Sequence, residues 1–147
     1  MLVKGAKAVG VVVPSSPAVS NGIVYVGSYD GSLYAFNATT GAQLWSVYTS
    51  GNIYSSPAVA DGVVYLGSGG SLDAFDAATG AELWSATTGA LVYSSPAVSN
   101  GMIYVGSYVS NLYAYALNGG DNAVYHTKLA RPKTSNLHPD FRLRLQH

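Results

Sequence analysis

The chain has 147 residues, no cysteine, and 7 basic residues balanced by 7 acidic ones, so its formal net charge is zero. Only 10% of its residues are charged, well below the ~25% typical of soluble domains, and 48% are hydrophobic. This composition excludes a disulfide framework and a thiolate metal site. It also argues against disorder and against nucleic-acid binding driven by net charge.

Residues 1–14 form an N-terminal segment in which two lysines precede a short apolar run, AVGVVV at 8–13. A secretory signal peptide begins in this way, but the run is short and interrupted by glycine, and no clear cleavage site follows it. The run could instead add a strand to the structure that follows. No part of the sequence approaches the ~18 consecutive apolar residues of a membrane span.

The pentapeptide SSPAV begins at residues 15, 55 and 94, which gives separations of 40 and 39 residues. A fixed period of this size is typical of a repeat architecture, in which each repeat is one supersecondary unit. The period divides the chain into repeats at 15–54, 55–93 and 94–127, and it leaves a basic C-terminal tail at 128–147.

The first repeat contains four short apolar stretches separated by three turn signals. The signals are Asn21-Gly22, Asp30-Gly31 and Thr40-Gly41. The first two favour type I′ hairpin turns, whose central residues both have positive φ. We therefore predict a β-meander with strands at about 16–20, 23–28, 32–37 and 43–48.

The later repeats contain turn signals at the corresponding positions, and no helical periodicity appears anywhere. Their turn signals are Asp61-Gly62, Gly69-Gly70 and Thr79-Gly80, then Asn100-Gly101, Ser110-Asn111 and Gly119-Gly120. The second repeat is one residue shorter because Tyr29-Asp30 shrinks to Gly69. A proline at 17, 57 or 96 stands at the start of each first strand, where the missing N–H is tolerated.

The second strands read IVYVGS, VVYLGS and MIYVGS, which are almost continuous apolar runs. Such runs indicate sheets that are covered on both faces. A small meander is covered on both faces when copies of it stack radially, whereas linear solenoids use one or two strands per coil. We therefore predict an all-β fold, a partial β-propeller of about three four-stranded meander blades.

Across the third turn of the first two repeats, residues 35–45 read AFNATTGAQLW and residues 74–84 read AFDAATGAELW. Both resemble the tryptophan-docking motif of quinoprotein dehydrogenases, A-x-D-x-x-T-G-K-E-x-W. The two copies match it at Ala35, Thr40, Gly41 and Trp45, and at Ala74, Asp76, Thr79, Gly80, Glu82 and Trp84. Over about 15–127 the chain thus resembles the pyrroloquinoline-quinone (PQQ)-like propeller repeat.

The resemblance implies that Trp45 and Trp84 dock against the neighbouring blade. Within the second copy, Asp76 and Thr79 can bond to backbone N–H groups of the turn. Where the motif has Gly, Glu and Trp, the third copy has Gly120, Asn122 and Val124. We interpret 94–127 as a last blade that lacks the docking tryptophan, because terminal repeats are commonly atypical.

The resemblance also raises the question of an active site. PQQ-dependent dehydrogenases hold PQQ and a calcium ion on the propeller axis beside a catalytic Asp, and some use a pair of adjacent cysteines. Here cysteine is absent, most acidic residues lie in turn signals, and only about three blades are present. We therefore predict no catalytic residue, no metal site and no bound cofactor in this chain.

Other polar patterns carry weaker signals. The three histidines lie late in the chain without metal-ligand spacing, at His126, His138 and His147. The serine pairs of the SSPAV segments have no preceding histidine that could activate a nucleophile, so their recurrence indicates a structural role. Asn37-Ala38-Thr39 is a formal glycosylation sequon, which matters only in a eukaryotic secretory pathway.

Asp73 is the one inconsistency within a predicted strand. It occupies the position held by Tyr34 and Tyr113 in the other repeats. A carboxylate in a covered strand is costly unless it is paired or hydrated. We expect an exposed or channel-facing edge position, or else a contact with a ligand or a cation.

The basic residues all lie outside residues 8–127, two at the front and five in the tail. The tail is either solvated or docked on the acidic body of its own or a neighbouring chain. An incomplete ring also leaves the first and last blades with uncovered apolar faces. We expect these faces to be covered by a second copy, by a protein partner or by the terminal segments, and we expect no nucleic-acid partner.

These observations favour a non-catalytic scaffold that presents its surface for protein or ligand binding. The resemblance places such proteins outside the cytoplasm, in the periplasm or at the cell surface. The alternative is the C-terminal part of a PQQ-dependent dehydrogenase whose active site lies in missing sequence. A structural cell-surface repeat module is a third reading.

Overall fold

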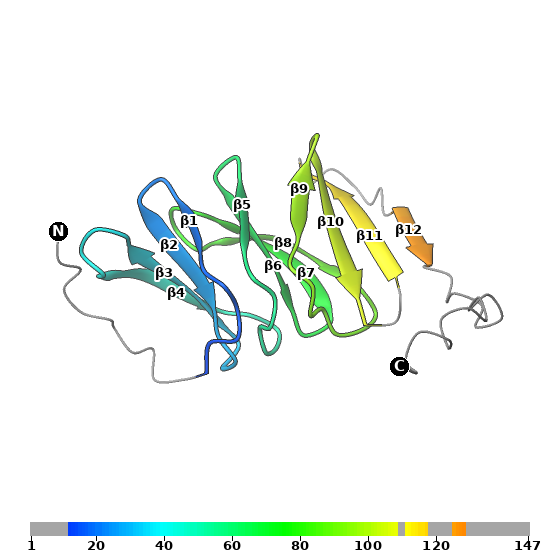
Figure 1. Cartoon of the computed structure of the whole chain (residues 1–147), viewed down its shortest axis with the longest axis horizontal. Helices are drawn as coiled ribbons and strands as arrows, with labels where there is room; N and C mark the ends of the chain where they lie inside the picture. Colours follow the sequence, from blue (N-terminus) through cyan, green and yellow to red (C-terminus); the bar gives the residue numbers. More distant parts are fainter. Residues whose placement is uncertain (1–11, 109–110, 118–124, 129–147) are drawn as a thin grey trace, which may run out of the picture.

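The computed structural model describes residues 12–108, 111–117 and 125–128, and these form three four-stranded sheets. Each sheet is an antiparallel meander in which the strands follow chain order from one edge to the other. The sheets stand next to one another along the long axis of the molecule (Figure 1). The predicted all-β fold of three four-stranded meanders is confirmed, and no helix that could cross a membrane occurs among these residues.

The strand boundaries repeat from sheet to sheet. The first sheet contains β1 (Ala18–Ser20), β2 (Ile23–Gly27), β3 (Ser32–Asn37) and β4 (Gln43–Tyr48). The second contains β5 (Ala58–Ala60), β6 (Val63–Ser68), β7 (Ser71–Asp76) and β8 (Glu82–Thr87). The third contains β9 (Ala97–Ser99), β10 (Met102–Ser107), β11 (Asn111–Ala116) and β12 (Tyr125–Lys128). The last strand therefore ends one residue beyond the predicted limit of 127.

The first hairpin of every sheet turns as the sequence predicts. Both central residues have positive φ in all three copies: 48° and 75° at Asn21-Gly22, 50° and 76° at Asp61-Gly62, and 50° and 73° at Asn100-Gly101. This is the backbone of a type I′ turn, which matches the right-handed twist of the strands it joins. These turns fix the register between the first and second strands of each sheet.

The second hairpin corrects two of the predicted turns. The Gly31 N–H donates to the Ser28 carbonyl at 3.1 Å, so the loop has three residues, with Gly31 at φ 85° as its last. Asp30 has no positive φ, and the predicted type I′ turn at Asp30-Gly31 is therefore wrong. In the third sheet, Asn111 pairs with Ser107 and begins β11, so it is not a turn residue.

The second sheet has the short form of this loop. Ser68 pairs directly with Ser71, which leaves Gly69-Gly70 as a two-residue connection with Gly69 at φ 50°. Glycine adopts this left-handed backbone at no steric cost, as Asn and Asp do at lower frequency in the first hairpins. The loss of one residue here accounts for the change of period from 40 to 39.

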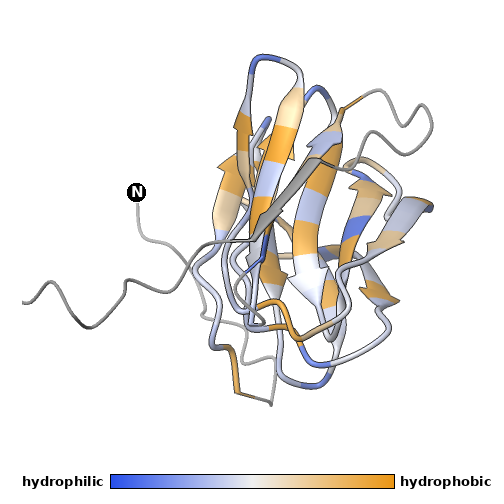
Figure 2. Ribbon diagram, turned by 90° about the vertical axis from the view of Figure 1, so that its right-hand side faces the viewer, coloured by the Kyte–Doolittle hydropathy of each residue, from blue (hydrophilic) through white to orange (hydrophobic). Residues whose placement is uncertain are grey.

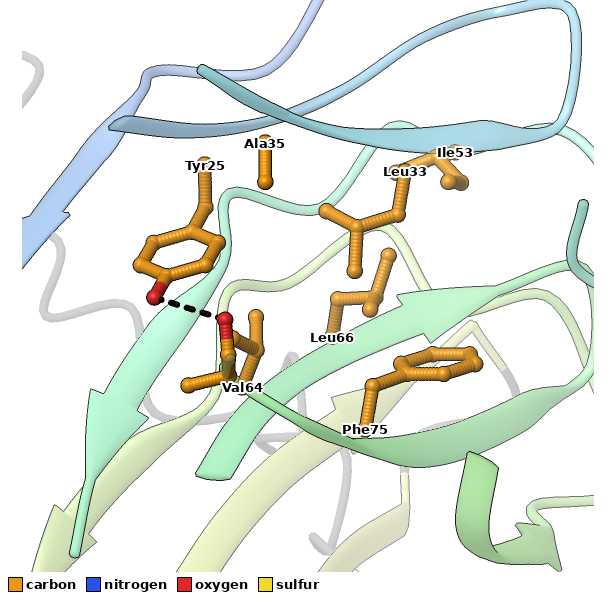
Figure 3. Close-up of a cluster of buried hydrophobic side chains, with 8 residues drawn as sticks. Tyr25, Leu33, Ala35, Ile53, Val64, Leu66 and Phe75 are labelled. Carbon is orange, nitrogen blue, oxygen red and sulfur yellow. Dashed lines mark hydrogen bonds between the residues drawn. The ribbon is translucent and has the colours of Figure 1, made fainter. Parts of the chain in front are cut away.

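Two hydrophobic clusters fill the spaces between the sheets. The first joins Tyr25, Leu33, Ala35 and Ile53 to Val64, Leu66, Phe75 and Ala77. Figure 3 shows Leu33 and Leu66 approaching each other from the two sheets. The second cluster joins Tyr65, Leu72, Ala74 and Val92 to Ile103, Val105, Tyr113 and Tyr115. The core therefore lies between blades, as it must in a stack of small sheets.

The stack ends on faces that have no neighbouring sheet among the described residues. Tyr25 and Tyr65, at the same position of β2 and β6, are each 1% exposed, but Tyr104 of β10 is 37% exposed. Leu33 and Leu72 are fully buried, whereas Leu112 of β11 is 38% exposed. Figure 2 shows the molecule from the side of the third sheet, with hydrophobic residues spaced along its strands. We call this surface the outer face of the third sheet.

The terminal segments lie largely outside the described residues. Of the segment expected to add a strand, residues 12–14 are described and lie outside any strand. The Val12 carbonyl accepts a hydrogen bond from the Tyr29 N–H at 2.9 Å. The tail beyond Lys128, with the proposed apolar and basic contacts, lies outside the described residues.

Candidate functional site

Trp45 of β4 lies across the boundary between the first and second sheets. Its indole N–H donates to the Ala77 carbonyl at 3.2 Å, and the Tyr25 hydroxyl donates to the same oxygen at 3.0 Å (Figure 3 draws the second bond). The indole lies so close to Gly80 that a Cβ at that residue would stand 2.7 Å from the ring. Gly80, at φ 76°, is thus required both by its turn and by the tryptophan above it.

Trp84 of β8 lies at the corresponding place between the second and third sheets. Its ring centroid is 6.0 Å from that of Tyr65 in its own sheet and 6.0 Å from that of Tyr115 in the next. It is partly buried against the second cluster. Both tryptophans therefore contribute to contacts between sheets, which is a structural task rather than a chemical one.

The register of β12 corrects the reading of the third repeat. Trp45 and Trp84 stand opposite Ala35 and Ala74, and the residue opposite Ala114 is Tyr125. The predicted occupant of this position, Val124, is therefore wrong by one residue. An aromatic residue, not valine, takes the tryptophan register in the third sheet.

The serine pairs of SSPAV have two distinct structural roles. The first serine of each pair bonds to a glycine in the second strand of its own sheet. The Ser15 hydroxyl donates to the Gly27 carbonyl at 2.8 Å and accepts its N–H at 2.9 Å, and Ser94 does the same with Gly106 at 2.9 and 2.8 Å. Ser55 accepts the Gly67 N–H at 3.1 Å. This serine ties the incoming connector to the sheet.

The second serine of each pair links one sheet to the next. The Ser16 N–H donates to the Ser56 hydroxyl at 2.8 Å, and the Ser56 N–H donates to the Ser95 hydroxyl at 3.0 Å. The bonds run in one direction through the stack, so Ser56 of the middle sheet both accepts from Ser16 and donates to Ser95. The structural role predicted for the serines accounts for their recurrence at a fixed period.

Asp73 is buried, at 3% exposure, so the expectation of an exposed edge position is wrong. Ser68 donates a short hydrogen bond to one carboxylate oxygen, and Ser85 donates to the other at 2.5 Å. Ser50 extends the network through contacts of 3.3 Å to Ser68 and 3.0 Å to Ser71. The serine hydroxyls supply the compensation that a buried carboxylate requires.

Asp73 does not fit a PQQ–calcium site. Both of its oxygens already accept bonds from serines, and it is the only buried carboxylate in the part of the chain that the structure describes. No group of three or more His, Cys, Asp or Glu side chains that could hold a metal occurs among those residues. We assign no chemical step to a PQQ group in this chain.

The turn carboxylates stabilise loops. The Asp76 carboxylate accepts bonds from the Thr79 hydroxyl and N–H, both at 2.8 Å, and from the Ala78 N–H at 3.0 Å. These bonds lower the pKa of Asp76. Burial raises the pKa of Asp30, but bonds from the Tyr34 hydroxyl and Ser32 N–H lower it by more, so it lies below its ordinary value.

The histidines are not brought together in the described structure. His126 lies in β12 opposite Tyr113. His138 and His147 lie outside the described residues. The sequon residue Asn37 uses its side-chain oxygen to accept the Thr39 and Thr40 N–H groups at 2.9 and 2.8 Å. It thus does in the first sheet what Asp76 does in the second.

The structure also reveals a row of tyrosines that sequence reasoning missed. Tyr29, Tyr54, Tyr93 and Tyr108 follow one another with ring-centroid separations of 5.6, 4.8 and 5.8 Å. Tyr29 and Tyr108 lie in the loops after β2 and β10, and Tyr54 and Tyr93 lie in the connectors between sheets. The available signal was the recurrence of YSSPAV and GSY, each found twice. We call these four residues the tyrosine row.

Comparison with known proteins agrees with this architecture. The family model described as outer membrane protein assembly factor BamB matches residues 6–144. No curated protein matches the sequence. Among solved structures, BamB from Moraxella catarrhalis superposes with a TM-score of 0.67 at 24% identity, covering 78% of this chain and 36% of that one.

Two further structures, an enzyme and a designed protein, share the fold. Quinohemoprotein alcohol dehydrogenase from Comamonas testosteroni gives a TM-score of 0.62 at 27% identity over 73% of this chain and 20% of that one. The computationally designed Ika4 protein gives 0.70 at 19% identity over 84% and 74%. The chain spans about a third of the length of the BamB structure that it matches. The stacked meanders and the family match over nearly the whole chain show that it belongs to the BamB family of PQQ-like β-propeller repeat proteins.

Proposed function

We propose that this chain is a non-catalytic propeller scaffold that binds protein through its terminal sheet faces, and that a second copy of the chain is one such partner. The observation that carries the proposal is the outer face of the third sheet. It exposes Tyr104 and Leu112, whose counterparts in the other two sheets are buried against a neighbour. Another sheet of the same repeat would bury the exposed apolar side chains of this face in the same way as the sheets inside the stack.

The glycines at the centre of each sheet support the same conclusion. A Cβ at Gly27 would stand 2.2 Å from Ile53, and one at Gly67 would stand 2.2 Å from Val92, because those apolar side chains cover the glycines inside the stack. At Gly106 the nearest described atom is the Ser94 hydroxyl at 3.4 Å. The third sheet thus presents the site at which an apolar residue rests in the other two.

The first sheet offers a complementary surface. On its face away from the second sheet, the half-buried Val24 and Phe36 and the buried Val26 hold the positions of Val64, Phe75 and Leu66, which receive Leu33 and Tyr25 in the first cluster. Contact between the third sheet of one copy and the first sheet of the next would repeat the internal packing. Such a head-to-tail contact is heterologous, so it closes a ring or extends a filament according to its rotation.

Light scattering over a range of concentrations tests this proposal. We expect the wild-type mass to rise above the 15.2 kDa of one chain, and we expect Leu112→Lys to suppress the rise. Leu83→Lys is the matched control, because Leu83 is 51% exposed on β8 of the middle sheet. A wild-type chain that stays monomeric throughout, or equal effects of the two variants, would overturn self-association.

The family supports a role in protein binding, since its description is that of an assembly factor. A second candidate is a part of a PQQ-dependent dehydrogenase, which the likeness to a quinohemoprotein alcohol dehydrogenase favours. The active site would then lie in other parts of a longer protein. Titration with PQQ and Ca²⁺ of a longer protein that contains this chain separates the two, because a saturable change in quinone absorbance would favour the dehydrogenase.

A further inference from the structure

The tyrosine row is a second binding surface, and we propose that it recognises an extended, proline-containing polypeptide segment. The inference rests on the proposed function of the chain as a binding scaffold, and it names the class of ligand. The row is separate from the outer sheet faces, because its residues come from loops and connectors at one end of the strands of all three sheets. The ends of β2 and β10, which precede Tyr29 and Tyr108, lie along the lower edge of the molecule in Figure 1.

The two central tyrosines contact each other directly. Tyr29 and Tyr108 occupy one position of the repeat, and Gly69 replaces them in the second sheet. The second sheet therefore adds no tyrosine to the row, and the rings of Tyr54 and Tyr93 are 4.8 Å apart, the shortest separation in the row. The row is therefore continuous across the middle sheet.

The backbone beneath the row is held by repeated hydrogen bonds. The Tyr29 N–H donates to the Val12 carbonyl and the Tyr108 N–H to the Leu91 carbonyl, both at 2.9 Å. Tyr54 and Tyr93 directly precede Ser55 and Ser94, which bond to the second strands of their sheets. A ligand would meet a surface whose backbone is already ordered, which lowers the entropic cost of binding.

Exposure and composition favour a protein ligand. Tyr29, Tyr93 and Tyr108 are exposed, although buried positions exist for tyrosine elsewhere in the fold. The surrounding loops consist largely of Ser, Gly and Asn, as in YTSGNIYSS at 48–56. Tyrosine with such neighbours is the composition of antibody paratopes, where the rings supply rigid contact area and the small polar residues supply hydrogen bonds.

Charge and ring geometry narrow the class of ligand. No Lys or Arg occurs between residues 8 and 127, so the loops and connectors that carry the row contain no Lys or Arg with which to pair an acidic ligand. Successive rings are inclined by 79°, 58° and 73°, so they form a series of ridges rather than one flat platform. A sugar ring stacks best on a flat aromatic face, whereas a polyproline II segment docks between aromatic side chains.

The length of the row suits a short segment. Its three centroid separations span at most about 16 Å, and a polyproline II helix rises ~3.1 Å per residue. The row therefore accommodates about five residues. The Tyr54 hydroxyl is hydrogen-bonded to Tyr29, and the hydroxyls of Tyr29, Tyr93 and Tyr108 can donate hydrogen bonds to the carbonyl groups of such a segment, which a polyproline II backbone leaves free.

Fluorescence anisotropy with a labelled decaproline peptide tests the inference on the full chain, and a labelled (Gly-Ser)₅ peptide controls for non-specific binding. We expect saturable binding of decaproline alone, with affinity at least tenfold weaker in Tyr54→Ala and Tyr93→Ala. Tyr48→Ala is the matched control, because Tyr48 is exposed on β4 and has no ring contact with the row.

Three outcomes would overturn the inference. They are no saturable binding of decaproline, equal affinity for the two peptides, or equal affinity of the row variants and the wild type. Binding of a β-linked oligosaccharide at the row without binding of decaproline would also overturn it, since the ligand would then be a saccharide. Light scattering of the wild type and the same variants keeps the two proposals apart. Row variants that bind decaproline weakly but self-associate normally support the row as a separate site, whereas a wild-type chain that self-associates but does not bind decaproline contradicts only the role of the row.

Discussion

The inner boundary between the first and second sheets and the outer face of the third sheet are built from the same residues at the same positions. Tyr25, Leu33 and Gly27 at the boundary correspond to Tyr104, Leu112 and Gly106 on the outer face. At the boundary the residues are buried and the glycine is covered by Ile53, and on the outer face they are exposed. The comparison teaches that burial in this fold is conferred by the next repeat and not by the sheet itself.

The largest expected difference in stability is between alanine variants of Leu72, which is buried, and Leu112, which is exposed. Leu72→Ala should lower the free energy of unfolding by about 3 kcal/mol, because it opens a cavity between the second and third sheets. Leu112→Ala should cost less than about 1 kcal/mol in dilute solution, since little apolar area is lost from an exposed position. Urea denaturation measures both, and equal losses would show that the outer face is covered in the free chain.

Removal of the tryptophan contact should have the next largest effect on stability. Trp45→Ala should lower the free energy of unfolding by about 2–3 kcal/mol, because it removes a partly buried ring and the hydrogen bond to Ala77. Leu44→Ala, at an exposed neighbour on the same strand, is the control. If thermal or urea unfolding shows no difference between these variants, Trp45 does not hold the first two sheets together.

Glycine substitutions sharpen the comparison. Gly67→Ala should destabilise by about 2 kcal/mol, because its Cβ would overlap the Val92 side chain and force the sheets apart. Gly106→Ala should be close to neutral, because Ser94 is the only described residue within 4 Å of the new atom. Comparable losses at the two positions, measured by chemical denaturation, would contradict the difference between inner and outer faces.

Two tyrosine hydroxyls between the second and third sheets should respond differently. The Tyr113 hydroxyl donates to the Thr88 carbonyl at 2.6 Å, so Tyr113→Phe should cost about 1 kcal/mol. The Tyr115 hydroxyl is buried without a partner among the described residues, and burial raises its pKa to about 12. Tyr115→Phe should therefore leave stability unchanged or raise it slightly, and a loss as large as that of Tyr113→Phe would show that this hydroxyl is paired.

The smallest effect concerns acid stability. Because hydrogen bonds lower the pKa of Asp76 in the folded chain, its stabilising contribution is present above the unfolded pKa and is lost as the pH falls through the folded one. The relevant window lies below about pH 4, near the pKa of a free Asp. Asp76→Asn should flatten the pH dependence of unfolding there, since Asn37 supports the same turn as an amide. An unchanged acid profile would contradict this role.

Much of the fold could be predicted from the sequence because the relevant signals are local. The type I′ turns follow from Asn-Gly and Asp-Gly, and the serine pairs and tryptophans recur at a fixed period. The errors arose where the sequence does not show how many residues form a loop or how two strands are aligned. The loop at Asp30-Gly31 has three residues rather than two, and the register of β12 places Tyr125 where Val124 was expected.

The sites depended on contacts between repeats, which local patterns do not contain. Asp73 was recognised as unusual, but its burial depends on Ser68 and on Ser85 of the adjacent strand. The tyrosine row joins residues from separate loops and connectors, and Tyr54 contacts Tyr93 directly at the sheet that has Gly69 in place of a tyrosine. Sequence alone gives the recurrence of these residues but not which of them meet.

Hydroxyl-radical footprinting at low and high protein concentration tests the central claim most directly, because Tyr25, Tyr65 and Tyr104 are the same residue type in the same strand position. In dilute solution we expect Tyr104 to be modified much faster than the other two. At high concentration its rate should fall toward theirs as the outer face of the third sheet is covered. Equal protection of all three tyrosines in dilute solution, or a fast rate for Tyr104 at every concentration, would contradict the account of this face as the binding surface of the scaffold.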